Sequence, residues 1–554
     1  MLGLMLANSM ILPACASKQS AEPDAVGGPV VMRRLTESQY RASIADIFGP
    51  DIPIVGRFEP GLRSDELIAV GTSEAGLSPF SVEQYDASAR GIAAAVLSED
   101  KRQKFVPCKS HRDTNFNESC AQQFIATIAY QLFRRPLDDS ALLGYVSAAR
   151  ASFDRLNSFN AGLESALSAL LVSPEFLLRI ERAKPDPERS DRYRLDAWSR
   201  ATRLSYFLTD STPDEELLKA AASGELDHTR GVSRQVSRLM ATPRFESAIR
   251  AFFQDMLHFD RFADLAKDPL IYPAFNSVAA EDAQEQTLKI IIDHLQSRNG
   301  DYRELFTTRA APLTRALGPI YRMPVPPRNG WVQAKFSERS GRAGIQSNIS
   351  FLALHSHPGR SSPTLRGRAV REIFLCQPVP DPPADVNFSG FNESSTAFKP
   401  TARDRLGTHQ TEPVCKGCHN LMDPLGLTLE QYDGLGSFRT VENDTPIDVS
   451  GALDGNEFVA ASGLGDALSK HPQTPRCLVD KIYRAAVGRR MVAVERPFIE
   501  FLNQRFAVSG FRVPELMRTI AMSDAFNVVS NPDERQHADK VVKLKKEESF
   551  NEEG

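Results

Sequence analysis

The stretch Cys415-Lys416-Gly417-Cys418-His419 constrains this chain more than any other, because Cys-x-x-Cys-His is the attachment signature of a c-type haem. Residues three apart lie on one face of a helical turn, so two thiols can each add to a vinyl group of the same haem. The histidine that follows is then delivered to the iron as the proximal ligand. The composition of the chain gives about 0.002 chance occurrences of this motif. The motif therefore predicts one covalently bound haem c on Cys415 and Cys418, with His419 on the iron.

Three other uses of the cysteine pair remain open. It could be half of a zinc site, a redox dithiol or a local disulfide. Zinc would need two further ligands, and although His409 is near, the sequence contains no second Cys-x-x-Cys and no His-x-x-x-His.

The surroundings of the motif suggest how a haem would be held. The second ring nitrogen of His419 needs an acceptor, and we expect a backbone carbonyl in a turn formed by residues 423–426. Met422 leaves the helix on the same side as His419, so we expect it to pack under the ring edge. Arg366 and Arg439 are candidates for charge-assisted bonds to the haem propionates, with a helix-face salt bridge as the alternative for Arg366.

The sixth iron ligand has to come from another part of the chain. The candidates are His357, which lies in a Pro/Gly turn, His409, His471, and Met491, which follows the end of a predicted helix. For each histidine the alternative is an ordinary surface side chain. A methionine ligand would raise the reduction potential of the haem.

The N-terminus predicts export. Residues 1–14 form a short apolar segment before Cys15, which is typical of the apolar part of a signal peptide. Residues 12–15, Leu-Pro-Ala-Cys, resemble a lipobox with Cys15 as the lipidated residue, although Pro13 and the lack of a preceding basic residue depart from that pattern. The alternatives are cleavage at the A-x-A site of residues 14–16, or a frayed cytosolic N-terminus. We expect a lipoprotein of the periplasm or outer membrane, held to the membrane by its lipid anchor only.

Export gives the remaining cysteines a meaning, because an oxidising compartment favours disulfides. Without Cys15 and the haem pair, four of the seven cysteines remain. Cys108 and Cys120 flank a polar loop and are expected to pair, which leaves Cys376 to pair with Cys477 around the haem motif. Buried free thiols are the alternative.

Length and pattern predict a mainly α-helical chain of several helical domains with a C-terminal, cytochrome-c-like helical haem module. At about 150 residues per domain, 554 residues suggest three or four domains. No basic patch interleaved with aromatic residues suggests nucleic acid, and no apolar run reaches the ~20 residues of a membrane span. We expect a signal or lipoprotein segment (1–15), a tether (16–30), helical domains (31–105, 106–184 and 190–325), a haem-binding domain (340–445), a closing helical domain (446–530) and a disordered charged tail (531–554).

Capping residues predict several helix starts. Thr36 is expected to begin a helix that Gly49 ends, Thr212 is expected to cap another, and Ser173-Pro174 and Ser362-Pro363 are typical of a cap followed by proline at the first helical position. Residues 183–193 are expected to be a linker by composition.

Seven stretches together resemble a known family: 33–49, 129–137, 170–181, 203–221, 355–383, 415–439 and 477–488. They resemble a bacterial family of secreted multi-domain proteins, of planctomycete and myxobacterial type, described as a tandem of domains of unknown function with a cytochrome-c-like Cys-x-x-Cys-His in its C-terminal part. The resemblance follows the chain in order. It implies export and a c-type haem, and it implies no substrate.

These observations favour an exported mono-haem protein that transfers electrons at the bacterial cell envelope to a redox partner that the sequence does not identify. If the sixth position is open, a haem-dependent oxidase or peroxidase-like enzyme is the alternative. A non-redox, disulfide-stapled binding or structural protein of the envelope is another. A hydrolase acting through paired carboxylates is the weakest, since nothing marks such a pair among the 70 acidic residues. The sequence leaves the oligomeric state open.

Overall fold

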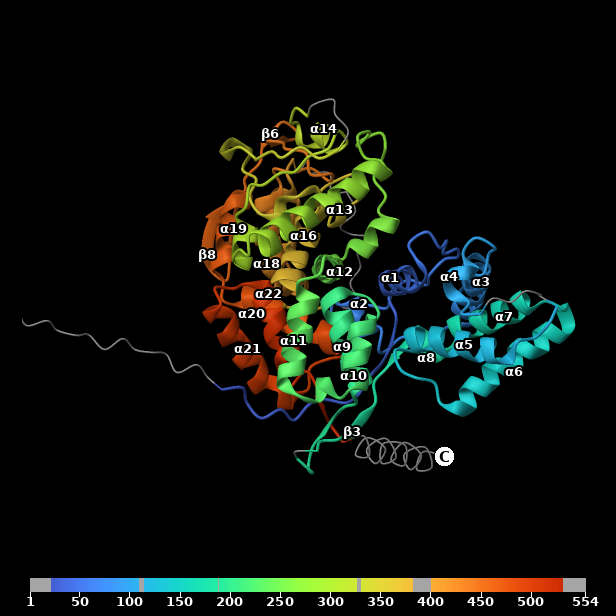
Figure 1. Cartoon of the computed structure of the whole chain (residues 1–554). Coiled ribbons are helices and arrows are strands. Elements are labelled where there is room, and N and C mark those ends of the chain that lie inside the picture. Colours follow the sequence, from blue (N-terminus) through green and yellow to red (C-terminus); the bar gives the residue numbers. More distant parts are fainter. Residues whose placement is uncertain (1–20, 109–113, 188, 326–329, 382–399, 532–554) are drawn as a thin grey trace, which may run out of the picture.

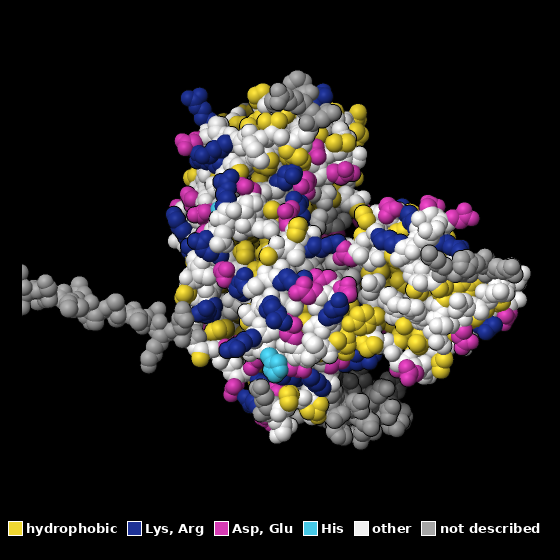
Figure 2. Space-filling model, in the orientation of Figure 1, with side chains coloured by type: hydrophobic (Ala, Val, Ile, Leu, Met, Phe, Trp, Pro, Cys, Tyr) yellow, Lys and Arg dark blue, Asp and Glu magenta, His cyan; other side chains and the backbone are white. Residues whose placement is uncertain are grey.

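The computed structural model describes residues 21–108, 114–187, 189–325, 330–381 and 400–531. Over these residues the fold is mainly α-helical, as predicted, and its few strands are short. Figure 1 shows a smaller helical unit, coloured blue to cyan, beside a larger body that contains the rest of the chain. Among the described helices, none has the length and apolar character needed to cross a membrane. On the face shown in Figure 2, basic and acidic side chains are interspersed over the larger body.

The smaller unit, which we call the N-terminal unit, is a group of helices around one hydrophobic core. The bounds of its helices are α1 (Glu37–Phe48), α3 (Pro79–Val96), α4 (Arg102–Phe105), α5 (Glu118–Phe133), α6 (Asp139–Leu156), α7 (Phe159–Leu171) and α8 (Pro174–Leu177). The predicted apolar face of α1 is buried, with Tyr40 and Ile44 fully inside. Because the core contains side chains from Leu35 to Leu177, the segments 31–105 and 106–184 fold around a common interior.

The predicted helix caps of the N-terminal unit are confirmed. The Thr36 side chain accepts from the backbone N–H of Gln39, and Gly49 ends α1 with a φ of 110° that suits glycine. Ser173 caps α8, with Pro174 at its first position. The disulfide between Cys108 and Cys120, also predicted, fixes the start of α5.

The larger unit, which we call the main body, contains most of the remaining elements. Its α-helices are α2 (Ile68–Gly71), α9 (Ala197–Thr209), α10 (Glu215–Ala222), α11 (Thr229–Met240), α12 (Arg244–Met256), α13 (Ser277–Ile292), α14 (Leu317–Tyr321), α15 (Ile349–Leu354), α16 (Pro363–Ala369), α17 (Ala402–Thr411), α18 (Pro413–Gly426), α19 (Ala460–Lys470), α20 (Gln473–Val487), α21 (Arg496–Val508) and α22 (Val513–Met522). Short 3₁₀ or π turns are η1 (Glu225–Asp227), η2 (Phe259–Asp264), η3 (Asp293–Ser297), η4 (Tyr302–Phe306), η5 (Glu338–Ser340), η6 (Ile345–Ser347), η7 (Val370–Phe374), η9 (Leu427–Leu429) and η10 (Ala493–Glu495). One core extends from Ala201 to Phe526, so the segments 190–325, 340–445 and 446–530 also share an interior.

The strands connect parts of the chain that are distant in sequence. Strand β1 (Met32–Arg34) pairs antiparallel with β2 (Leu178–Ile180), with Arg33 opposite Arg179. Strands β3 (Ala183–Pro185), β4 (Tyr193–Leu195) and β9 (Val528–Val529) form a three-stranded sheet in that order. The hairpins β5 (Val441–Glu442) with β6 (Thr445–Pro446), and β7 (Ser450–Leu453) with β8 (Asn456–Val459), follow α18.

Three local predictions are wrong. Residues 183–193 are not a free linker, because they form the β3–β4 hairpin that β9 extends. The described part of the predicted tether lies against the protein, since the Gly28 carbonyl accepts from Ser530 N at 2.9 Å. The cap of α10 is Asp214 rather than Thr212, because the Asp214 side chain accepts from the backbone N–H of Leu217.

A buried ion cluster ties the N-terminal unit to the main body. The Glu181 carboxylate accepts from Arg203 Nη2 at 2.6 Å and from Arg33 Nη2 at 3.4 Å. Arg33 also donates to the carbonyl of Ala485 at the end of α20. Both arginines and the glutamate are almost fully excluded from solvent. Buried charges are tolerated when they are paired and hydrogen-bonded, as these are.

Asp210 makes a second buried contact between the two units, and it predicts a pH-dependent stability. Its carboxylate accepts from Ser38 and from Gln39 Nε2 of α1. Burial raises the pKa of Asp210 to about 6, although both hydrogen bonds oppose the shift. Between about pH 4 and about pH 6 the folded state therefore binds this proton more tightly than the unfolded state, so the contribution of Asp210 to stability falls as the pH rises.

Asp210→Asn is expected to remove this dependence. The free energy of unfolding of the variant, minus that of the wild type, should rise by about 3 kcal/mol from pH 4 to pH 7. The reason is that the pKa of Asp210 is raised by about two units, and one unit corresponds to about 1.4 kcal/mol. Urea unfolding of both proteins at pH 4, 5, 6 and 7 measures the difference. A difference that is constant over this range would contradict the prediction.

Candidate haem-attachment site

The Cys-x-x-Cys-His motif lies on helix α18. The helix has Pro413 at its first position, where the missing N–H costs nothing, and it continues through residues 415–419. Cys415 and Cys418 are free thiols, each partly exposed, and their spacing of three places them on one helical face. The prediction that residues 423–426 form a turn is wrong, because α18 extends to Gly426 with Pro424 inside it.

Helix α16 packs against the second half of α18 at backbone distance. Gly367 on α16 lies against the carbonyl of Met422, and Gly426 on α18 lies against the carbonyl of Pro363. A Cβ atom at either glycine would overlap that carbonyl, so glycine is required for this approach. As predicted, Ser362 caps α16 with Pro363 at its first position. Helix α16 therefore holds the second half of α18 in a fixed place.

The two arginines expected at the haem propionates have structural roles instead. Arg366 is fully buried, and its guanidinium donates to the carbonyls of Leu429 (2.9 Å), Tyr432 (2.7 Å) and Leu352 (3.3 Å). Burial lowers the pKa of Arg366 to about 10, and Glu430 partly compensates. Arg439 donates to the Glu430 carboxylate at 2.9 Å and to its carbonyl at 3.0 Å. These donors of both arginines are therefore used within the protein.

The partner of His419 differs from the expected backbone carbonyl. His419 Nδ1 lies 2.9 Å from Oδ2 of Asp423, one helical turn further along α18. The other carboxylate oxygen of Asp423 accepts from Thr364 Oγ1 of α16 at 2.8 Å. The sequence reasoning missed both residues, although the spacing of four between His419 and Asp423 on a helix is a signal for such a pair.

The candidates for the sixth iron ligand differ in their exposure and in the partners that already engage them. His357 is exposed in the loop between α15 and α16, and its carbonyl accepts from Lys267 Nζ at 3.2 Å. Both ring nitrogens of His471 are engaged, by Asp454 at 3.1 Å and by the backbone N–H of Gln473 at 3.1 Å. The side chain of His409 lies outside the described residues, as does Cys15.

The residue before Met491, Arg490, contacts the loop that precedes α2. Cys477 lies near the start of helix α20, and the end of the helix at Val487 is about 15 Å from it along the helix axis. The next residues run towards that loop, where Arg490 Nη2 donates to Ser64 Oγ at 3.1 Å. The neighbour of Met491 is therefore bound to that loop rather than to α18. Met422 is buried, at 6 % exposure.

The surface of α18 around the thiols fits a covalently attached haem. Val414 and Leu421 are large apolar side chains that α18 exposes next to the motif, at 66 % and 42 %. Cys418 Sγ lies 3.8 Å from the carbonyl of Pro380, in the segment that follows the predicted disulfide between Cys376 and Cys477. A haem bound to the two thiols would cover this apolar surface. In the described part of the chain, no cluster of three or more His, Cys, Asp or Glu residues is arranged to hold a metal ion.

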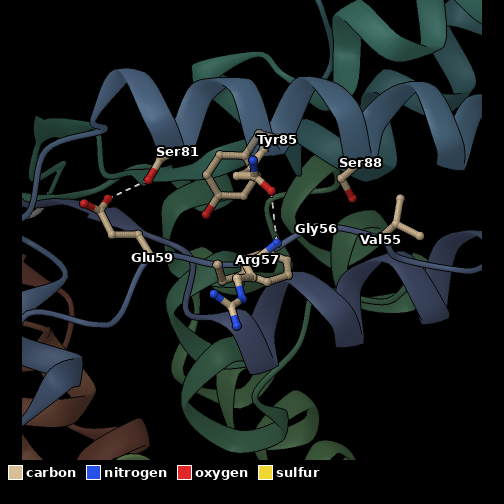
Figure 3. A pocket seen from close by; sticks show the side chains of 9 residues that line it. Val55, Gly56, Arg57, Glu59, Ser81, Tyr85 and Ser88 are labelled. Atoms are coloured by element: carbon tan, nitrogen blue, oxygen red, sulfur yellow. Dashed lines mark hydrogen bonds between the residues drawn. The ribbon is translucent and has the colours of Figure 1, made fainter. Parts of the chain in front are cut away.

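A small pocket in the N-terminal unit is separate from the motif. Figure 3 shows it between the loop of residues 55–59 and helix α3, with Tyr85 and Ser88 on the helix side. The loop is held to α3 by hydrogen bonds from Ser81 Oγ to Glu59 (2.5 Å) and from the Arg57 N–H to Gln84 (3.1 Å). The pocket contains no residue of the motif.

Five family models match the chain in succession. Each is described as a protein of unknown function: DUF1587 over residues 33–98, DUF1595 over 120–181, DUF1592 over 195–323, DUF1588 over 342–442 and DUF1585 over 454–526. The chain is a tandem of these five domains. The DUF1588 model, named PSCyt3, contains α16, α18 and the whole motif. No curated protein and no solved structure matches the chain.

Proposed function

We propose that this tandem protein binds one c-type haem on α18 and transfers electrons at the bacterial cell envelope. The observation that supports it best is the arrangement on one helix of two free thiols, three residues apart, followed by a histidine whose Nδ1 is held by Asp423. Cys415 and Cys418 would form the thioether bonds and His419 would be the proximal ligand. When bound, the haem would supply a one-electron redox couple. The name of the DUF1588 model, PSCyt3, agrees with a cytochrome-related domain.

The two disulfides support the proposed location. Disulfides form and persist in secreted and periplasmic proteins, and the protein has one in the N-terminal unit and one in the main body. The predicted export signal would bring the protein to the kind of compartment in which c-type haem is attached. We place the protein in the periplasm or on the outer membrane, with Cys15 as the proposed lipid anchor.

A haem-dependent oxidase or peroxidase-like activity is the second candidate. One observation favours it: of the four sixth-ligand candidates, His471 has both ring nitrogens engaged, and the residue before Met491 is bound to another part of the protein. An open sixth position would allow the iron to bind a small oxidant such as peroxide.

The reduced absorption spectrum and a pyridine haemochrome assay test the proposal. The protein is exported in a host with c-type haem maturation and compared with Cys415→Ala/Cys418→Ala. We expect a c-type spectrum in the wild type and none in this variant. Cys108→Ala/Cys120→Ala, which also removes two cysteines, is the matched control and should keep the haem.

The same spectrum separates the candidate functions. A low-spin band would support electron transfer, and a high-spin band would support an open, reactive iron. A wild-type protein without covalent haem would overturn both and leave a disulfide-stapled envelope protein as the better account.

A further inference from the structure

Asp423 is a fully buried carboxylate whose two oxygens are both used. Oδ2 accepts from His419 Nδ1 at 2.9 Å, and Oδ1 accepts from Thr364 Oγ1 at 2.8 Å. The side chain of Asp423 is 0 % exposed, whereas that of His419 is 19 % exposed. The pair is therefore anchored from the inside, by α16, and its histidine is the more exposed member.

The position of Asp423 is unfavourable by the usual rules of helix and core formation. It lies in the last turn of α18, where the helix dipole disfavours a negative charge. Pro424 follows it, and a residue before proline is disfavoured in helical conformation. Within the described residues, Asp423 forms no ion pair with an arginine or a lysine, although buried carboxylates normally have such a partner. Residues that break several local rules at once are expected at functional sites.

The hydrogen bond has a defined effect on His419 as a metal ligand. With its Nδ1–H donated to the carboxylate, the neutral ring presents the lone pair of Nε2 to a metal. Carboxylate partners of this kind fix the ring orientation and raise the basicity of the ligand. A more basic ligand stabilises ferric iron over ferrous iron, which lowers the reduction potential.

We propose that Asp423 is a positioning residue for His419 that holds the reduction potential of the attached haem low. The inference rests on the proposed function, because it requires a haem on Cys415 and Cys418. It specifies the class of redox partner, since only an electron donor of low potential can reduce such a haem. Thr364 takes part by donating a hydrogen bond to the other oxygen of the carboxylate.

The test is the reduction potential of the haem-loaded protein and of Asp423→Asn, measured by spectroelectrochemistry. Outer-shell partners of metal ligands change metal binding by about 10- to 100-fold. If the variant loses its preference for ferric over ferrous iron by the same 10- to 100-fold, its reduction potential rises by about 59 to 118 mV, at about 59 mV per tenfold. Thr364→Val should give a smaller rise in the same direction. It keeps the proposal testable if Asp423→Asn fails to fold.

Asp454→Asn is the matched control, because the Asp454 carboxylate pairs with His471 at 3.1 Å and with Arg371 at 2.8 Å rather than with His419. It removes one carboxylate charge without removing the bond to His419. A haem-loaded Asp423→Asn whose potential equals that of the wild type or of Asp454→Asn would overturn the role of Asp423 alone. A wild-type protein without haem would overturn the proposed function itself, so the two failures are distinct.

Discussion

Replacing Cys376 and Cys477 together by serine is expected to lower the free energy of unfolding by about 5 kcal/mol. The disulfide joins residues 101 positions apart. In the chain-entropy account, a cross-link that closes a loop of about 100 residues stabilises the folded state by about 4.7 kcal/mol. The loop contains α17, α18, α19 and the start of α20, so the unfolded chain gains much freedom when the bridge is removed. Urea unfolding followed by circular dichroism, with midpoint and slope, measures the change.

The second disulfide of the same protein is the control. Cys108 and Cys120 are only 12 residues apart, and the same account gives about 3 kcal/mol for Cys108→Ser/Cys120→Ser. The long bridge should therefore cost more than the short one. Equal losses, or a larger loss for the short bridge, would contradict the entropic argument and attribute the stabilisation to contacts in the folded state.

Removal of the long bridge should also affect the candidate site. The backbone after Cys376 passes α18, where the Pro380 carbonyl lies 3.8 Å from Cys418 Sγ. Residue 376 is fixed by the bridge to α20, which is part of the main core. Without the bridge this segment has one fewer anchor beside the thiol that is proposed to bind haem.

The features that the sequence predicted correctly depend on neighbours within a few residues. Thr36, Ser173 and Ser362 cap their helices because a side-chain oxygen reaches an N–H two or three positions ahead, whatever the rest of the chain does. For the same reason the motif could be placed on a helix before the fold was known. The disulfides are an exception, since Cys376 and Cys477 are 101 positions apart; their pairing followed from counting the cysteines that an exported protein is expected to pair.

The features that the sequence did not predict depend on distant partners. Pro424 and Gly426 indicated a turn, but α18 continues through them because Gly426 packs on Pro363 of α16. The composition of residues 183–193 indicated a linker. Their sheet could not be foreseen because β9, which completes it, lies more than 330 positions away. Likewise Arg366 could not be recognised as a buried donor, since its acceptors lie between 10 and 67 positions away.

Arg366→Met is expected to lower the free energy of unfolding by about 3 to 5 kcal/mol, the range found when one partner of a buried ion pair is removed. The guanidinium is fully buried and joins α15, α16 and the segment after α18 through backbone carbonyls. Methionine fills similar space but donates no hydrogen bond, so these carbonyls lose their partner. The Glu430 carboxylate, whose pKa burial already raises, also loses one of its two arginines. Urea unfolding measures the loss.

Arg368→Met is the matched control on the same helix. The Arg368 side chain is 34 % exposed and pairs with Glu372 one turn ahead, and such surface pairs are worth about 0.5 kcal/mol. A similar loss in both variants would show that Arg366 acts only through packing of its aliphatic part.

The double variant Arg366→Met/Glu430→Gln separates the two reasons for the loss at Arg366. If the unpaired charge of Glu430 is the larger cost, neutralising Glu430 should recover part of the stability, because Arg439 then faces an amide that can still accept its hydrogen bond. If the orphaned carbonyls are the larger cost, the double variant should be no more stable than Arg366→Met. Either way Arg366 stabilises the contact between α16 and the chain that leaves α18. His419 depends on that contact, since Thr364 of α16 holds its partner Asp423.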